Sequence, residues 1–110
     1  MSKTLSITSG EYRGRKIIAP DTDKTHPMGS REKLALFNAV ISVFGPLDDA
    51  GSVLDAFCGS GALGLEALSR GAKKAIFIDN SKAAIKATKD NIAALGLEQR
   101  TDVLKTDIKF

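Results

Sequence analysis

The sequence predicts an α/β protein in which a small N-terminal β-hairpin precedes an incomplete doubly wound parallel sheet. Two observations predict this fold class. From Ser52 onward, short apolar runs alternate with segments of helical periodicity, and a glycine-rich turn follows the first run. Before Gly29, two β-type runs flank a glycine-containing turn. Alternating strands and helices imply right-handed crossovers and a ligand outside the carboxyl ends of the strands.

The composition is that of one ordinary globular domain. Of the 110 residues, 43% are apolar and 26% are charged. No apolar run reaches the length of a membrane span, and no apolar signal core follows the N-terminus, so we expect a cytoplasmic protein without a membrane partner. Cys58 is the only cysteine. A single cysteine excludes an internal disulfide and a cysteine-based metal cluster. We expect Cys58 to be a small buried residue and the protein to have no metal site.

Residues 1–29 are predicted to form a basic hairpin and loop. The strands are expected at Leu5–Thr8 and Lys16–Ala19. Residues 1–38 hold seven Lys or Arg against four acids, whereas residues 39–110 hold nine against nine. A basic arm on a neutral domain favours a polyanionic substrate, because Lys and Arg release counterions from phosphates. A solvated hairpin without a partner is the alternative.

Residues 30–46 are predicted to form a helix that links the arm to the core. Ser30 can cap it, and Gly45-Pro46 ends it. We expect it to lie against the sheet through apolar residues at helical spacing, which are Leu34, Phe37, Ile41 and Phe44.

Residues 47–110 contain the strand and helix alternation. The first strand, Val53–Phe57, leads through the glycine loop into a helix over Ala62–Arg70, with Gly71 as its C-terminal cap. The second strand is Lys74–Asp79. The next helix begins at Ser81 and ends at Gly96, with one face formed by Ile85, Thr88, Ile92 and Leu95. The third strand is Asp102–Lys105.

The glycine loop, residues 59–64 with the sequence GSGALG, matches G-x-G-x-x-G, which alone suits any nucleotide that approaches the backbone closely. Asp55 discriminates between cofactors, because it is an acid within the apolar first strand. It would oppose the pyrophosphate of a dinucleotide. The cationic sulfonium and amino groups of S-adenosylmethionine suit it better. A half-domain of an NAD-dependent oxidoreductase stays open as an alternative.

Asp79 ends the second strand, 20 positions after Gly59, where a carboxylate can accept both ribose hydroxyls. The alternative role is that of a turn-capping aspartate before Asn80-Ser81. Asp107 follows the third strand and could contact the adenine amino group, or have no such role. The predicted cofactor-binding residues are Asp55, Phe57, Gly59, Ser60, Gly61, Asp79, Asn80 and Asp107.

Three stretches carry a resemblance to a known family. They are GEYRGRKIIAP at 10–20, LDAFCGSGALGLEALSRGA at 54–72 and KAIFIDNS at 74–81. These stretches resemble the bacterial 16S ribosomal RNA guanine-N2 methyltransferases of the RsmD type. The resemblance implies a Rossmann-like methyltransferase fold, S-adenosylmethionine as cofactor, and 16S rRNA or the small ribosomal subunit as partner. It also implies that the N-terminal segment holds RNA, for which the candidate residues are Arg13, Arg15, Lys16 and Arg31.

The stretch HPMGSREKLALFN at 26–38 departs from the family pattern. It has His26, Ser30, Lys33 and Leu34 where that pattern has arginine, aspartate, arginine and glutamate. Polar groups that would reach the cofactor or substrate are therefore replaced. His26 is expected to be a loop residue.

The family's Asp/Asn-Pro-Pro-Tyr/Phe motif, which holds the target amino group and stacks on the base, does not occur in this sequence. We therefore expect an N-terminal portion of a methyltransferase whose catalytic residues lie beyond Phe110, and which is inactive alone. A non-catalytic module that binds S-adenosylmethionine or RNA is the alternative. Val53–Phe57 would then be an exposed edge strand, so we expect self-association or marginal stability.

Overall fold

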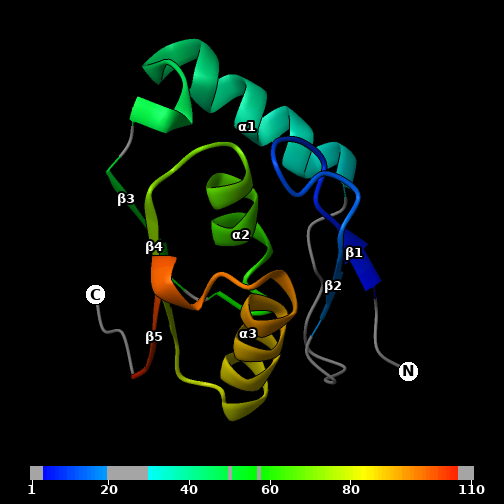
Figure 1. The fold of residues 1–110 in the computed structure, drawn as a ribbon, viewed down its shortest axis with the longest axis vertical. Coiled ribbons are helices and arrows are strands. Elements are labelled where there is room, and N and C mark those ends of the chain that lie inside the picture. The colour runs from blue at the N-terminus through cyan, green and yellow to red at the C-terminus, as the bar shows by residue number, and fades with distance from the viewer. Residues whose placement is uncertain (1–3, 20–29, 50, 57, 107–110) are drawn as a thin grey trace.

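The computed structural model describes residues 4–19, 30–49, 51–56 and 58–106 (Figure 1). Two short 3-10 turns cover Leu47–Asp49 and Glu98–Arg100. The helices and strands, in chain order, are β1 (Thr4–Ser6), β2 (Lys16–Ile18), α1 (Ser30–Phe44), β3 (Ser52–Ala56), α2 (Ala62–Ser69), β4 (Lys74–Asp79), α3 (Lys82–Leu95) and β5 (Thr101–Lys105). These bounds confirm each predicted element to within two residues.

The strands form two sheets. β1 and β2 pair antiparallel, and β3, β4 and β5 form a parallel sheet in that order. Ala56 pairs with Ile78 and Asp79 with Lys105, so the carboxyl ends of the three strands meet at one edge. In Figure 1, α2 and α3 lie between the parallel sheet and the hairpin, and α1 crosses above them. The Rossmann-like α/β prediction is confirmed.

The core lies where α2 and α3 pack on β4 and the hairpin. Phe77 of β4 and Ile17 of β2 are fully buried there, with Leu65 of α2 between them in the same cluster. The caps of α3 are as predicted: the hydroxyl of Ser81 accepts from the N–H of Ala84 at 3.3 Å, and Gly96 has a φ of 69°. These caps fix both ends of α3.

The buried face of α1 differs from the prediction. Leu34 and Phe44 are 42% and 81% exposed, whereas Lys33 and Phe37 are buried. The reason is that this helix contacts two charged side chains, Arg70 and Glu66. The guanidinium of Arg70 lies 4.8 Å from the centre of the Phe37 ring, and Lys33 pairs with a glutamate of α2. The helix therefore packs on α2 and β1 through a face that includes a lysine.

β3 is at the edge of the described sheet, and its Leu54 side chain is 64% exposed. An apolar edge strand is available for pairing with another chain, so the expected self-association stays a prediction. Among the described residues, no helix has the length and apolar character needed to cross a membrane.

Candidate cofactor site

The glycine loop connects β3 to α2 at the carboxyl edge of the sheet. Gly59 and Gly61 have φ values of 56° and 81°, a left-handed conformation that other residues adopt at a cost. A Cβ at Gly59 would meet no atom within 4 Å, so the loop backbone is open there. A Cβ at Gly64 would collide with the ring of Phe77. The first two glycines therefore shape a turn that is open at Gly59 and packed against Thr88 and Phe77 at Gly61, and the third lets α2 approach β4.

Two side chains of α3 hold the carbonyl groups of this loop. The hydroxyl of Thr88 donates to the Gly59 carbonyl at 2.9 Å, and the amide nitrogen of Asn91 donates to the Ser60 carbonyl at 2.8 Å. Both side chains are buried. Sequence analysis missed this role, although Thr88 was placed on the inward face of its helix. The available signal was two polar residues, three positions apart, on an otherwise apolar face.

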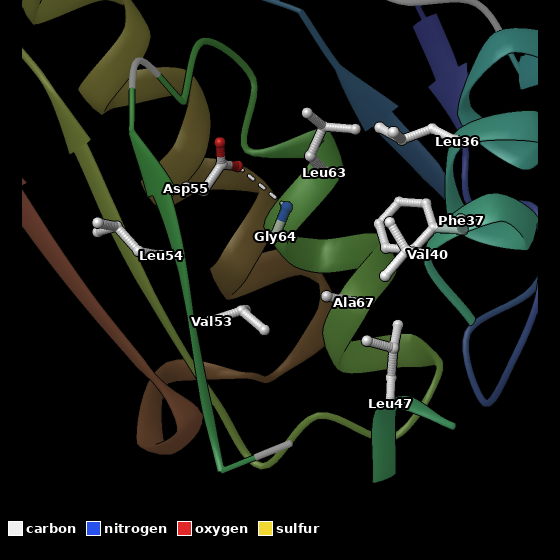
Figure 2. A pocket seen from close by; sticks show the side chains of 10 residues that line it. All are labelled: Leu36, Phe37, Val40, Leu47, Val53, Leu54, Asp55, Leu63, Gly64 and Ala67. Carbon is white, nitrogen blue, oxygen red and sulfur yellow. Dashed lines mark hydrogen bonds between the residues drawn. The ribbon is translucent and has the colours of Figure 1, made fainter. Parts of the chain in front are cut away.

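Asp55 extends from β3 toward α2, as Figure 2 shows. Its Oδ2 accepts from the N–H of Gly64 at 3.0 Å, and the residue is 8% exposed. Burial raises the pKa of Asp55 to about 6, although the Gly64 N–H lowers it, and the charge of Asp79 raises it further. Because few groups compensate the negative charge of Asp55, a cationic ligand beside it would stabilise the ionised carboxylate.

Asp79 ends β4 and joins two loops. Its Oδ2 accepts from the N–H of Gly59 at 3.2 Å, and its Oδ1 accepts from the N–H of Ser81 at 3.0 Å. The bond from Ser81 is the turn contact considered as the alternative to ribose binding. Because each carboxylate oxygen has two lone pairs, these contacts leave acceptor capacity for hydroxyl groups.

The structure brings six predicted cofactor residues to one place. Asp55 and Asp79 flank the loop of Gly59, Ser60 and Gly61, and exposed Asn80 follows Asp79. The hydroxyl of Ser60 accepts from the N–H of Ala62 at 3.3 Å. Phe57 and Asp107 lie outside the described residues, as does His26. Two carboxylates beside an open glycine turn fit a cationic ribonucleoside such as S-adenosylmethionine.

An apolar cavity of about 230 Å³ lies next to this site (Figure 2). Its walls come from α1, β3 and α2, and include Leu36, Val40 and Leu63. Asp55 and Gly64 touch it, whereas Gly59, Gly61 and Asp79 do not line it. The cavity therefore adjoins the predicted cofactor site at Asp55, and apart from this carboxylate its side chains are apolar and offer a ribose no hydrogen bonds.

The basic candidates are at the surface. Arg13, Arg15 and Lys16 are exposed on the hairpin, and Arg31 is exposed in the first turn of α1. The guanidinium of Arg15 donates to the carbonyl of Ala94 at 2.8 Å, and the amine of Lys16 donates to the hydroxyl of Ser6 at 3.1 Å. The hairpin thus presents cations while it is attached to α3.

Glu66 of α2 attaches the hairpin from the other side. Its carboxylate accepts from the Thr8 N–H and hydroxyl, both at 2.9 Å, and from the Ser9 N–H at 3.1 Å. It also pairs with Lys33 at 3.2 Å and Arg70 at 3.0 Å. Sequence analysis missed Glu66 and treated Lys33 as a departure from a family pattern. The structure gives Lys33 a partner, with its amine also donating to the Ser6 carbonyl at 2.7 Å.

Cys58 is buried, as predicted, and its sulfur lies 3.2 Å from the Thr88 hydroxyl. Burial raises the pKa of the thiol to about 11, so it is protonated near neutral pH and is a poor nucleophile.

Comparison with known proteins agrees with this geometry. The family model described as Conserved hypothetical protein 95 matches residues 5–109. The chain is 42% identical over 94 residues to Ribosomal RNA small subunit methyltransferase D of Escherichia coli K12, covering 86% of this chain and 46% of that protein. It is 38% identical over 103 residues to YlbH of Bacillus subtilis, a candidate rRNA methyltransferase, covering 94% and 54%.

Solved structures confirm the fold. The structure of yhhF from Escherichia coli, a candidate methyltransferase, superposes with a TM-score of 0.79 and 37% identity, covering 96% of this chain and 54% of that one. The chain spans about half the length of the relatives that it matches. The chain therefore belongs to the family described as Conserved hypothetical protein 95, the RsmD-type family that its hairpin and glycine loop resemble.

Proposed function

We propose that the chain is the cofactor-binding and N-terminal portion of an S-adenosylmethionine-dependent methyltransferase that acts on ribosomal RNA. One observation carries the proposal: Asp55, the residue before the last of β3, and Asp79, the last residue of β4, flank a glycine turn that is open at Gly59. Ligands of doubly wound sheets bind at this edge. The names of the relatives support the reaction and the substrate class.

In this proposal Asp55 attracts the cationic end of S-adenosylmethionine and Asp79 accepts the ribose hydroxyls. The backbone at Gly59 allows the ligand a close approach, since no atom stands where its Cβ would be. S-adenosylmethionine supplies the methyl group when it is bound. Phe57, Asn80 and Asp107 complete the proposed set of contacts.

The proposed substrate is the N2 amine of a guanine in 16S rRNA, as naked RNA or in the small subunit. Arg13, Arg15, Lys16 and Arg31 would hold its phosphates. The catalytic groups are proposed to lie beyond Phe110, so the chain alone is expected to be inactive. A non-catalytic module is less favoured, because the relatives are named as methyltransferases.

Calorimetric titration with S-adenosylhomocysteine tests the cofactor site. We expect saturable binding that Asp55→Asn and Asp79→Ala each weaken. Asp90→Ala is the matched control, since Asp90 is an exposed carboxylate of α3 that pairs with Lys86 on the surface. Binding that NAD abolishes, or equal binding by all variants, would contradict the proposed site.

A filter-binding series with a 16S rRNA fragment at several salt concentrations tests the RNA surface. Arg13→Glu and Lys16→Glu should weaken binding and flatten its salt dependence, because fewer counterions are released. Lys86→Glu, an exposed cation on α3, serves as the control. Unchanged salt dependence in the hairpin variants would favour the solvated hairpin.

Self-association through β3 is a separate expectation of this proposal. Sedimentation equilibrium should show concentration-dependent association that Leu54→Lys reduces, because a charge on an edge strand opposes pairing. A monomer at all concentrations would contradict it.

A further inference from the structure

One side chain of α3 connects the hairpin to the glycine loop. The carbonyl oxygen of Asn91 accepts from the N–H of Ile18 at 2.9 Å. Its amide nitrogen donates to the carbonyl of Ile18 at 2.8 Å and to the carbonyl of Ser60 at 2.8 Å. Asn91 is 3% exposed. Both amide hydrogens and the carbonyl oxygen are therefore used, and two segments far apart in the sequence share one buried group.

At the hairpin, Asn91 bonds both backbone groups of one residue. Ile18 is the last residue of β2, and its Cα partner in β1 is Thr4. An N–H and a C=O that point away from the paired strand are normally left to solvent at a sheet edge. Here an amide side chain satisfies both, so the position of β2 depends on the position of α3.

At the loop, Asn91 fixes the plane of one peptide unit. The carbonyl of Ser60 belongs to the peptide that joins Ser60 to Gly61, and the N–H of the same peptide donates to the carbonyl of Cys58 at 2.7 Å. Because a peptide unit is planar, bonds on both of its sides determine its orientation. That peptide lies between the two glycines whose left-handed conformation makes the turn.

We propose that Asn91 is a positioning residue that couples the hairpin to the glycine loop. A ligand that orders the loop then also orders β2, and the reverse holds because such a coupling is reciprocal. The ligand in question rests on the proposed function. In an intact enzyme this arrangement would let the occupied cofactor site prepare the segment that holds RNA.

Three variants separate coupling from simple packing. Asn91→Ala removes the bonds to both segments. Thr88→Val removes the contacts of the Thr88 hydroxyl with the Gly59 carbonyl and the Cys58 sulfur, both on the loop side, since Thr88 has no described bond to the hairpin. Ser69→Ala removes bonds to the hairpin turn alone, since the Ser69 hydroxyl accepts from the N–H of Tyr12 and donates to the carbonyl of Ser9.

Backbone amide hydrogen exchange without ligand tests the physical connection. We expect Asn91→Ala to raise exchange in β2 and in the loop over residues 58–61 together. Thr88→Val should raise it in the loop only, and Ser69→Ala in the hairpin only. Faster exchange in just one of the two segments of Asn91→Ala would overturn the coupling. If this variant fails to give a cooperative melt, Asn91→Asp replaces it, because the carboxylate keeps the bond from the Ile18 N–H and loses those to both carbonyls.

Exchange with saturating S-adenosylhomocysteine tests the consequence. In the unmodified chain, exchange in the loop and in β2 should fall by at least about fivefold. In the Asn91 variant the ligand should protect the loop and leave β2 unchanged, whereas Ser69→Ala should keep the protection of both. Equal protection of β2 with and without Asn91 would overturn the proposal. If the unmodified chain does not bind the ligand, the proposed cofactor fails, and the ligand-free comparison still decides on the coupling.

Discussion

Glu66 and Asp55 are both buried carboxylates beside α2, and they differ in what surrounds them. Glu66 accepts hydrogen bonds from Thr8 and Ser9 of the hairpin and pairs with two cations. Burial alone would raise its pKa, but these hydrogen bonds and the charge of Lys33 keep that pKa below its usual value. Asp55 accepts one hydrogen bond within the described part of the chain, and its pKa is about 6.

The difference separates two uses of a buried charge. At Glu66 the fold itself supplies the compensating groups, so the carboxylate joins α1, α2 and the hairpin into one unit. At Asp55 the described residues supply fewer compensating groups than at Glu66. The Asp55 carboxylate also lies near the edge of the sheet where ligands of parallel sheets bind. An undercompensated carboxylate at this edge indicates a binding site, whereas a fully paired one indicates structure.

Glu66→Gln is expected to give the largest loss of stability. The variant leaves Lys33 and Arg70 buried without a counter-charge, which costs about 3–5 kcal/mol in the free energy of unfolding. Urea denaturation measures it. The control is Asp90→Asn, whose pair with Lys86 has side chains 59% and 79% exposed and which should change stability by less than about 0.5 kcal/mol. A Glu66→Gln variant as stable as the control would mean that the cluster does not hold the hairpin.

Two glycines of the loop allow the same comparison between a position that serves structure and a position that serves binding. Gly64→Ala places a Cβ against the Phe77 ring and should destabilise the chain by about 1–3 kcal/mol. Gly59→Ala meets no atom within 4 Å and adds only the strain of a φ of 56°, about 1 kcal/mol.

Thermal melts and titration with S-adenosylhomocysteine distinguish the two variants. Gly59→Ala should lose affinity out of proportion to its loss of stability, because its methyl group occupies the space that the ligand approaches. Equal effects of both variants on affinity and stability would argue against an open binding turn at Gly59.

The sequence predicted the elements because their signals are local. The glycine loop, the Ser81 cap and the Gly96 end each depend on a few neighbouring residues, and the structure places each as expected. Asp55 and Asp79 were predicted from local signals as well, because Asp55 is an acid within an apolar strand and Asp79 ends the next strand, 20 positions after Gly59. Their role in cofactor binding stays a prediction.

The connections between elements could not be predicted in this way. Lys33 was not among the residues predicted for the inward face of α1, and it is buried because it pairs with Glu66 of α2, 33 positions later. Asn91 likewise bonds groups 73 and 31 positions away. Such contacts depend on how elements pack in three dimensions, and helical periodicity contains no information on which buried polar group will find a partner.

Asp55→Asn should stabilise the chain while it weakens cofactor binding. Because the pKa of Asp55 is raised from 3.8 to about 6, the folded chain loses stability as the pH rises through this range. Above pH 6 the neutral amide avoids that cost, and we expect a gain of about 1–3 kcal/mol. Urea denaturation at pH 7 and pH 4 measures the gain, which should vanish at pH 4. Asp102→Asn, on an exposed residue, is the control. A destabilised Asp55→Asn variant at pH 7 would mean that the Gly64 bond outweighs the burial of charge.

Below pH 7, where the amino group of S-adenosylmethionine is protonated, the affinity for this ligand should depend on pH through Asp55. Below pH 6 the free chain carries a proton on this carboxyl, and a cationic ligand binds better after that proton is released, so affinity should fall up to about tenfold per pH unit between pH 6 and pH 5. Glu66 does not interfere, since its pKa is lowered and its carboxylate stays ionised over this range. Calorimetric titration from pH 5 to pH 8 measures the slope. Asp55→Asn should bind more weakly and with no slope, while Asp90→Ala should retain it. If the affinity of Asp55→Asn still changed with pH, another group would be responsible for the titration. The difference between Asp55 and Glu66 would then affect stability and not ligand binding.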